Sequence, residues 1–269
     1  DSLIADMVGR TLDNLFPKQE TTRGEEFLRI EHFNSVGVLR DVSFTAYAGE
    51  VLGFSGLVGA GRTETMRALF GADPKDSGDI YIKGKKVEIK SPKDAIANGI
   101  AFVTEDRKGE GLILDASVKN NLFLATIDKD THHGFLDQKK YDSVGKENVE
   151  TYKIKTPSLQ TPAGTLSGGN QQKVVIAKWV NTDADIYIFD EPTRGIDVGA
   201  KIEVYNVINK LCSEGKCVIM VSSELPEILG MSDRVIVMRE GKVMGELDRD
   251  SEFFNQESIM KAAWGGTLS

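Results

Sequence analysis

The sequence predicts an α/β protein in which helices cover a mainly parallel core sheet. Short apolar runs that resemble buried strands alternate with segments whose apolar residues recur at helical spacing, and this alternation is typical of parallel sheets. A glycine-rich loop lies between one such strand and a helix, and a mostly helical stretch is inserted between Glu105 and Ser167. The 269 residues are enough for one or two domains with a well-buried core.

The order of the predicted elements follows from these patterns. Apolar runs with turn residues on either side predict strands at 27–30, 36–44, 51–57, 100–103, 186–189 and 217–221. Runs that alternate around a glycine predict two hairpins, at 79–89 and 234–247. Apolar residues at helical spacing predict helices at 64–70, 137–152, 167–180, 198–211 and 225–229.

The chain is acidic, with a formal net charge of -8. An acidic protein repels phosphate backbones, so nucleic acid is not expected as its main partner. No run of about 18 apolar residues occurs, so the sequence predicts no membrane-spanning helix, and a membrane role would need a partner. Cys212 and Cys217 are expected to be reduced thiols of a cytoplasmic protein.

Both ends of the chain carry a similar short pattern. An acidic residue, a serine and two apolar residues open each of the segments 1–9 and 257–265, and a glycine closes each. Two interpretations stay open: helices share such a pattern by chance, or residues 1–10 are the tail of an earlier homologous domain. Under the second interpretation, residues 15–24, with a proline and several charges, form a linker.

Residues 56–63 read G-L-V-G-A-G-R-T, which matches the phosphate-binding pattern G-x-x-x-x-G-K-[ST] except that arginine replaces lysine. Glycines let backbone amides converge on phosphate oxygens, and the following helix offers its positive N-terminus. Thr63 is placed to bind Mg²⁺. The residues expected to contact a nucleotide here are Gly56, Gly59, Ala60, Gly61, Arg62, Thr63 and Glu64.

Two residues of this loop depart from what phosphate binding favours. Arg62 is a bulky planar fork where a compact ammonium is usual, and whether it binds phosphate or is displaced stays open. Glu64 places a carboxylate beside the phosphates, which it repels unless it turns away. We therefore expect this loop to bind nucleotide more weakly than a loop with lysine.

Residues 185–192 read D-I-Y-I-F-D-E-P, a buried strand that ends in two carboxylates. Asp190 is expected to hold Mg²⁺ directly or through water. Glu191 is expected to act as the general base or to orient the attacking water, because phosphoanhydride hydrolysis needs a basic group near an in-line water. The alternative for Glu191 is a simple charge at the start of the next helix.

Residues 166–172 read L-S-G-G-N-Q-Q at the start of a predicted helix. The hydroxyl of Ser167 and the amides of Gly168 and Gly169 converge at the helix N-terminus, and such an arrangement binds anions. The glycine-rich loop, this string and the acidic strand, in this order, resemble the phosphate loop, signature motif and Walker B strand of ATP-binding cassette (ABC) ATPases.

Four short strings make the resemblance more specific. They are similar to strings in the C-terminal ABC domain of the double-cassette ATPases that power bacterial import of monosaccharides such as ribose, galactose, arabinose and xylose. The strings that carry this similarity are at 61–64, 105–107, 166–173 and 190–199. In that family, two cassettes pack head to tail and enclose two ATP molecules.

The resemblance implies a P-loop NTPase fold of the ABC type, with an antiparallel β subdomain and a helical subdomain. The implied domain spans residues 26–250, with the helical subdomain at about 106–166. Residues 1–25 would be the tail of a preceding ABC domain plus the linker, and residues 251–269 a C-terminal helical tail.

The resemblance also assigns residues that the patterns alone do not. Glu105 stands at the Q-loop in place of glutamine and is expected near Mg²⁺ or water. Ser223 stands in place of the switch histidine and cannot carry its positive charge. Asp197 matches the D-loop, which runs along the interface in ABC dimers. Phe33 lies at the matching position for stacking on adenine, with a buried core side chain as the alternative.

The implied function is to couple the binding and hydrolysis of ATP with Mg²⁺ to sugar uptake. The resemblance also implies that the chain's own ATP site is degenerate, at Arg62 and Ser223. The residues expected to complete the other site, held by the N-terminal ABC domain of the same polypeptide, are Ser167, Gly168, Gly169, Asn170 and Gln171. The further expected partners are membrane permease subunits and, indirectly, a periplasmic sugar-binding protein, at the cytoplasmic face of the bacterial inner membrane.

Two alternatives remain beside a catalytic motor domain. In the first, the chain mainly supplies its signature residues to the other cassette and has little activity of its own. In the second, it is a soluble ABC ATPase of DNA repair or translation, for which a long coiled-coil insertion or a basic face is expected. Neither of those features is visible in the sequence.

Overall fold

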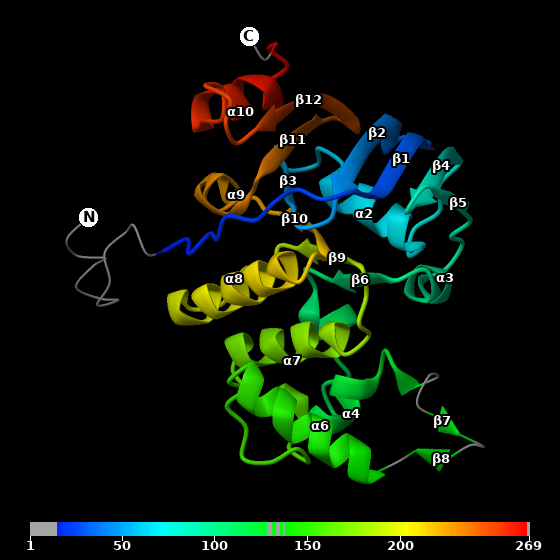
Figure 1. Cartoon of the computed structure of the whole chain (residues 1–269), viewed down its shortest axis with the longest axis vertical. Coiled ribbons are helices and arrows are strands. Elements are labelled where there is room, and N and C mark those ends of the chain that lie inside the picture. Colours follow the sequence, from blue (N-terminus) through cyan, green and yellow to red (C-terminus); the bar gives the residue numbers. More distant parts are fainter. Residues whose placement is uncertain (1–14, 128–130, 133–134, 137, 268–269) are drawn as a thin grey trace, which may run out of the picture.

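The computed structural model describes residues 15–127, 131–132, 135–136 and 138–267. A body built on two sheets carries a largely helical lobe on one side (Figure 1). This architecture confirms the predicted α/β class. The segment 1–10, in which the tail of a preceding domain is expected, lies outside the described residues.

The larger sheet forms the core of the body. In spatial order its strands are β12 (Lys242–Asp248), β11 (Arg234–Arg239), β3 (Val51–Gly56), β10 (Cys217–Val221), β9 (Ile186–Asp190) and β6 (Ile100–Val103). Every neighbouring pair is parallel except β11 with β12. The strands β6, β9 and β10 are buried along their whole length, which explains their continuous apolar sequences. Because β3, β9 and β10 are parallel, their carboxyl ends meet at one edge of the sheet.

The smaller sheet is antiparallel. Its strands, in spatial order, are β2 (Leu39–Tyr47), β1 (Glu26–Ser35), β4 (Ser77–Ile82) and β5 (Lys85–Val87). The hairpins predicted at 79–89 and 234–247 are confirmed as β4–β5 and β11–β12. The strand predicted at 36–44 is shifted, because a turn at 36–38 with Gly37 in a left-handed conformation precedes β2.

Helices cover the larger sheet and connect it to the smaller one. They are α2 (Arg62–Phe70), α3 (Pro92–Ala97), α8 (Val198–Ser213), α9 (Leu225–Met231) and α10 (Gln256–Ala263). Helix α2 contacts strands of both sheets, whereas α8 packs on β10 and α10 packs on β11 and β3. Within the part of the chain that the structure describes, no helix has the length and apolarity needed to cross a bilayer.

The lobe is formed by the chain between β6 and β9. Its elements are a π-helix η2 (Arg107–Gly111), α4 (Val118–Phe123), the short strands β7 (Thr131–His132) and β8 (Phe135–Leu136), α6 (Gln138–Thr151), a 3₁₀ turn η3 (Ala163–Thr165) and α7 (Gly168–Val180). Helix α7 contacts α4, α8 and β6 and so connects the lobe to the body. The predicted helices at 137–152 and 167–180 are confirmed as α6 and α7, whereas η2, β7 and β8 were not predicted.

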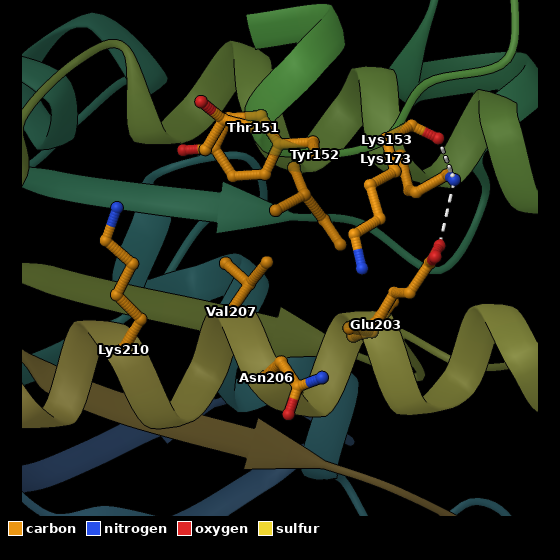
Figure 2. A pocket seen from close by; sticks show the side chains of 10 residues that line it. Thr151, Tyr152, Lys153, Lys173, Glu203, Asn206, Val207 and Lys210 are labelled. Carbon is orange, nitrogen blue, oxygen red and sulfur yellow. Dashed lines mark hydrogen bonds and ion pairs between the residues drawn. The ribbon is translucent and has the colours of Figure 1, made fainter.

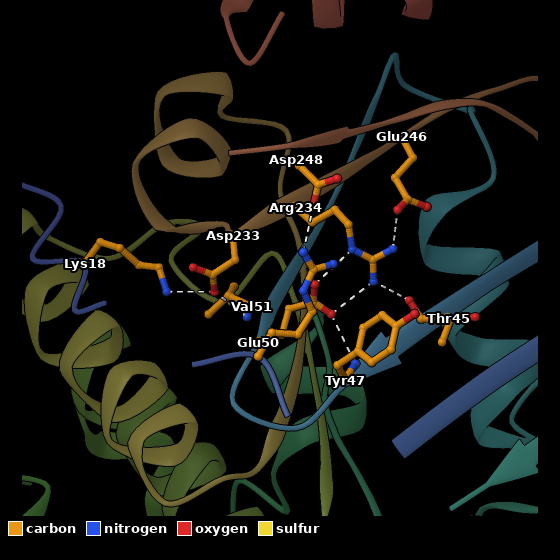
Figure 3. Close-up of polar contacts among 10 residues, drawn as sticks. Lys18, Thr45, Tyr47, Glu50, Val51, Asp233, Arg234, Glu246 and Asp248 are labelled. Atoms are coloured by element: carbon orange, nitrogen blue, oxygen red, sulfur yellow. Dashed lines mark hydrogen bonds and ion pairs between the residues drawn. The ribbon is translucent and has the colours of Figure 1, made fainter. Parts of the chain in front are cut away.

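Residues 15–25 lie extended against the body, and we call this segment the strap (Figure 1). The ring of Phe16 lies 5.7 Å from the ring of Tyr205 on α8, measured between ring centres. The ammonium of Lys18 pairs with the carboxylate of Asp233 at 2.8 Å (Figure 3). The segment predicted as a linker therefore makes apolar and ionic contacts with the body.

A buried ion pair joins the two sheets next to the strap. Arg234 on β11 and Glu50, in the turn before β3, form two hydrogen bonds of 2.9 and 3.0 Å, although the two residues are only 3% and 1% exposed (Figure 3). Arg234 also donates to the carbonyl oxygen of Thr45 on β2 and to the carboxylate of Glu246 on β12. The guanidinium therefore connects β2 of the smaller sheet to the strand that leads into the glycine-rich loop.

We expect Arg234→Met to lower the free energy of unfolding by about 3–5 kcal/mol, because it leaves the Glu50 carboxylate buried without a partner. Urea denaturation measures this change. The matched control is Arg23→Met, which removes an exposed pair with Asp248 and should cost less than about 1 kcal/mol. Equal costs for the two variants would contradict the central role of the buried pair.

Candidate nucleotide-binding site and signature groove

The predicted phosphate loop has the expected local structure. It begins where β3 ends at Gly56 and closes where α2 begins at Arg62. A side-chain carbon at Gly56 would come within 2.3 Å of the carbonyl oxygen of Met238, so no larger residue fits there. Gly61 caps α2 in a left-handed conformation, with a φ of 96°. The loop therefore presents the amino end of a helix, as anion binding requires.

Asp190 lies at the carboxyl end of β9, directly beside this loop. The hydroxyl of Thr63 donates a hydrogen bond of 3.0 Å to Oδ1 of Asp190. Burial raises the pKa of Asp190 to about 7, against the lowering effect of that hydrogen bond. Two of the three residues that the sequence predicts for Mg²⁺, Thr63 and Asp190, are thus adjacent, and hydroxyl and carboxylate oxygens suit this ion.

The side chain of Arg62 extends toward the carboxyl ends of β9 and β10. Its Nη1 donates a hydrogen bond of 2.7 Å to the carbonyl oxygen of Ser222, and its Nη2 lies 4.0 Å from a carboxylate oxygen of Glu191. Burial lowers the pKa of the Arg62 guanidinium, and the carboxylates of Glu191 and Asp190 oppose that change. The Arg62 side chain therefore contacts Ser222 and Glu191 in this structure, and whether it binds phosphate stays a prediction.

Glu191 has an unusual backbone conformation at the end of β9. Its φ is 46°, in a region that side chains other than glycine rarely adopt, and its N–H donates to the carbonyl oxygen of Val221 on β10. The hydroxyl of Ser223 donates to Oε2 of Glu191 at 3.1 Å. Burial raises the pKa of Glu191. The structure thus brings together Arg62, Glu191 and Ser223.

Other predicted site residues make their contacts elsewhere. Glu105 pairs with the side chain of Arg194, in the loop after β9. Phe33 is fully buried in the core below the smaller sheet, so the prediction that it stacks on adenine is wrong for this structure. Its alternative, a core side chain, is correct. Glu64 is half-buried in the first turn of α2, and Gly59 is exposed on the loop.

The signature string forms the N-terminus of α7. Ser167 is the capping residue, but its hydroxyl makes no capping hydrogen bond to the helix. Instead, the amide of Asn170 donates to Oγ of Ser167 at 2.9 Å, and the side-chain oxygen of Asn170 accepts from the backbone N–H of Lys155 at 2.8 Å. Gln171 is buried and points toward the 3₁₀ turn before the helix, with a 3.3 Å contact to the carbonyl oxygen of Ala163.

Asp197 places a second helix N-terminus beside the first. Its carboxylate caps α8 by accepting a 3.0 Å hydrogen bond from the N–H of Ala200. A side-chain carbon at Gly169 would come within 2.9 Å of the Ala200 side chain, so this glycine lets the starts of α7 and α8 approach closely. The predicted D-loop and signature residues are therefore neighbours.

A groove of about 440 Å³ opens along these two helix ends. Ser167, Gly169, Asn170 and Asp197 line it together with three lysines, at positions 153, 155 and 173. Figure 2 shows the cavity that adjoins the groove, where the Lys173 ammonium lies between the Lys153 carbonyl oxygen at 2.5 Å and the Glu203 carboxylate at 2.9 Å. The groove is therefore lined by both signs of charge, three lysines and the carboxylates of Asp197 and Glu203, and Glu203 pairs with Lys173.

Sequence reasoning missed two residues at these sites. Lys155 orients Asn170 through its backbone, which no side-chain pattern reveals. Arg107 donates to the carbonyl oxygen of Arg194 at 2.9 Å, and its guanidinium lies against Gly168. The string E-D-R at 105–107 was the only available signal for Arg107.

We expect Asp190→Asn to stabilise the protein without nucleotide or Mg²⁺ above neutral pH. The pKa of Asp190 rises from 3.8 in the unfolded chain to about 7 in the fold, so the folded state binds the proton more tightly. Stability therefore falls as pH rises from about 4 to 7, by up to about 4 kcal/mol. Urea denaturation at pH 4.5 and pH 8 tests this: the gain from Asp190→Asn should be large at pH 8 and small at pH 4.5. The same gain at both values would contradict the shift.

Comparison with known proteins bears on these sites. The family described as ABC transporter matches residues 39–194, which is more than half of the chain. The ribose import ATP-binding protein of Geobacillus kaustophilus is 52% identical over 266 residues, and that of Bacillus subtilis (strain 168) is 48% identical. A putative ribose/galactose/methyl galactoside import ATP-binding protein of Rhizobium etli is 49% identical.

These alignments include 98–99% of this chain but only 50–54% of each relative, so the chain spans about half the length of the relatives it matches. Among solved structures, the ADP conformation of the ATP-binding cassette MJ1267 superimposes with a TM-score of 0.74 at 21% identity, over 90% of this chain and 99% of that one. The post-hydrolysis dimer of the cassette MJ0796, bound to ADP and Pi, gives 0.72 at 21% identity, over 83% and 99%. These structures share the fold, and the family match shows that the chain belongs to the ABC transporter family of ATP-binding proteins.

Proposed function

We propose that the chain is a nucleotide-binding domain of a bacterial importer for ribose or a related monosaccharide. In this role it couples the binding and hydrolysis of ATP to sugar uptake. The names of the relatives support an import function. The alignments cover only about half of each relative, which supports a second domain of similar size in the same polypeptide. Under this proposal the chain is the C-terminal cassette, with the cassette itself at 26–250.

The observation that carries the proposal is the contrast between the two anion sites. At the signature groove, Ser167 accepts a hydrogen bond from Asn170, and Ser167 and Gly169 line the groove at the start of α7 together with three lysines and two carboxylates. At the phosphate loop, by contrast, Arg62 is bound to Ser222 and lies beside Glu191. We propose that the groove binds the ATP of the N-terminal ABC domain, while the chain's own site is degenerate.

Residues of the degenerate site retain the chemistry for slow hydrolysis. Thr63 and Asp190 would hold Mg²⁺, which neutralises charge on the phosphate oxygens. Glu191 would accept a proton from the attacking water, since its raised pKa makes it a better base than an exposed carboxylate. Ser223 donates to Glu191 and orients it, but it cannot supply the positive charge of a histidine.

The further partners in this proposal are permease subunits in the inner membrane and, through them, a periplasmic sugar-binding protein. A cavity of about 280 Å³ between body and lobe is a suitable contact for a permease loop on the cytoplasmic side. Phe70, Phe102 and Trp179 give it an apolar floor, and Arg67 and Glu110 line it as well. A role in DNA repair or translation is not favoured, because the relatives named above are import proteins.

We expect Arg62→Lys to tighten the binding of Mg·ATP to this chain by about tenfold. A lysine ammonium is compact enough to lie between phosphates, whereas the arginine must first leave Ser222 and Glu191. Isothermal titration calorimetry measures the affinity. The matched control is Arg23→Lys, on the strap, which should leave the affinity unchanged. Equal or weaker binding by Arg62→Lys would show that Arg62 does not limit nucleotide binding.

In the assembled importer, we expect Ser167→Ala to lower ATP turnover by about a hundredfold, as the loss of one preorganised donor does at other anion sites. Glu191→Gln should lower turnover much less, because it affects only the degenerate site. Steady-state phosphate release measures both, with Ser213→Ala at the end of α8 as the control. The reverse order of effects would mean that the chain is the catalytic motor and not mainly the donor of the signature.

A further inference from the structure

Contacts in both directions join the segment after β6 to the segment after β9. The side chain of Arg194 pairs with the carboxylate of Glu105. In the opposite direction, Nη1 of Arg107 donates to the carbonyl oxygen of Arg194 at 2.9 Å, and Nη2 makes a longer contact of 3.5 Å with the carbonyl oxygen of Gly195. Each segment therefore holds the other through an arginine.

The guanidinium of Arg107 also lies against the start of α7. A side-chain carbon at Gly168 would come within 2.9 Å of Nη2 of Arg107 and within 3.4 Å of the carbonyl oxygen of Gly195. Gly168 directly follows Ser167, so the guanidinium is located between the signature and the loop after β9. Among the described residues, Nε of Arg107 is buried and has no hydrogen-bond partner, so only the two outer nitrogens fix its position.

These contacts connect three segments that a movement of the lobe would displace: η2, the turn after β9 and the start of α7. Arg107 begins η2, the π-helix at which the chain leaves the body, and such helices often occur at functional sites. The N–H of Arg194 donates to the carbonyl oxygen of Glu191 at 3.1 Å, which closes a tight turn directly after the acidic strand. One guanidinium thus reaches the beginning of the lobe, the turn after Glu191 and the start of α7.

We infer that Glu105, Arg107 and Arg194 form a latch that sets the position of the signature relative to the turn after Glu191. Arg107 is then a positioning residue for Ser167. This inference rests on the proposed function, and it adds a route by which the degenerate site affects the groove: displacement of the turn after Glu191 shifts Arg107, and Arg107 shifts the start of α7. In this structure Glu105 serves the latch.

The parts of the latch contribute unequally. The Glu105 and Arg194 side chains are 35% and 66% exposed, so solvent screens their attraction and the pair can open at little cost. The 2.9 Å bond from Arg107 to the carbonyl oxygen of Arg194 is charge-assisted and has good length, whereas the 3.5 Å contact with Gly195 is weak. A lysine at position 107 would keep the charge but lose the planar fork that contacts two carbonyl oxygens at once.

The test compares Arg107→Lys with Lys108→Ala in the assembled importer. Lys108 is the exposed neighbour in η2. We expect Arg107→Lys to lower kcat for ATP about tenfold with little change in KM, because it misplaces Ser167 without removing a nucleotide contact. Lys108→Ala should match the wild type. Hydrogen exchange at the amides of 167–170 should be faster in Arg107→Lys, and the thermal midpoint should stay unchanged.

Three outcomes overturn the inference: a wild-type kcat in Arg107→Lys, unchanged exchange at 167–170, or equal losses in Arg107→Lys and Lys108→Ala. A charge exchange tests the remaining pair. Arg194→Glu alone should lower kcat, because it sets two carboxylates against each other. Adding Glu105→Arg should restore most of the loss. If the double variant has the same kcat as Arg194→Glu alone, the ion pair between Glu105 and Arg194 is not part of the latch.

Ser167→Ala distinguishes failure of the inference from failure of the proposed function. If Ser167→Ala lowers turnover about a hundredfold while Arg107→Lys does not change it, the groove acts as proposed and the latch is wrong. If Ser167→Ala has no effect on turnover, the proposed function itself fails. In that case the exchange measurement still reports whether Arg107 holds the start of α7.

Discussion

The two adjacent carboxylates at the end of β9, Asp190 and Glu191, require a positive charge nearby because they lie close together and Asp190 is buried. Asp190 is buried, Glu191 lies beside it, and an uncompensated pair of this kind is costly in a protein interior. Arg62 supplies the compensation from the first residue of α2. The remaining cost appears as the raised pKa of Asp190. The acidic strand therefore determines the orientation of Arg62, the one cation of the glycine-rich loop, and Ser223 adds a neutral hydrogen bond to Glu191.

Much of the fold was predictable because the relevant patterns are local. The buried strands β6, β9 and β10 are continuous apolar runs, and α7 has a serine cap before two glycines. The juxtaposition of Thr63 and Asp190 also followed from sequence, since the loop after β3 and the end of β9, a parallel strand of the same sheet, lie at the same edge. These features require only strand periodicity and the geometry of parallel sheets.

The rest depended on contacts between distant residues. The position of Phe33 in the sequence matches that of an adenine-stacking residue, but this match could not show that the side chain points into the core. The register of β1 decides which face of the sheet each side chain occupies. The Q-loop position suggested a metal contact for Glu105, but its partner, Arg194, lies far along the chain. The direction of Arg62 likewise depends on a carbonyl group of Ser222, which no sequence pattern identifies.

Under the proposed function, the strap would change how the preceding cassette reaches this domain. Phe16 and Lys18 are already bound to α8 and to Asp233, so a domain joined upstream is tethered at α8 and not at the start of β1. A shorter free tether raises the effective concentration of the tethered group at the surface beside it, since that concentration falls steeply with tether length. Under the proposed function, the contacts of the strap would therefore favour pairing of the two cassettes within one polypeptide over pairing between separate molecules. They would do so without adding any area to the interface between the cassettes.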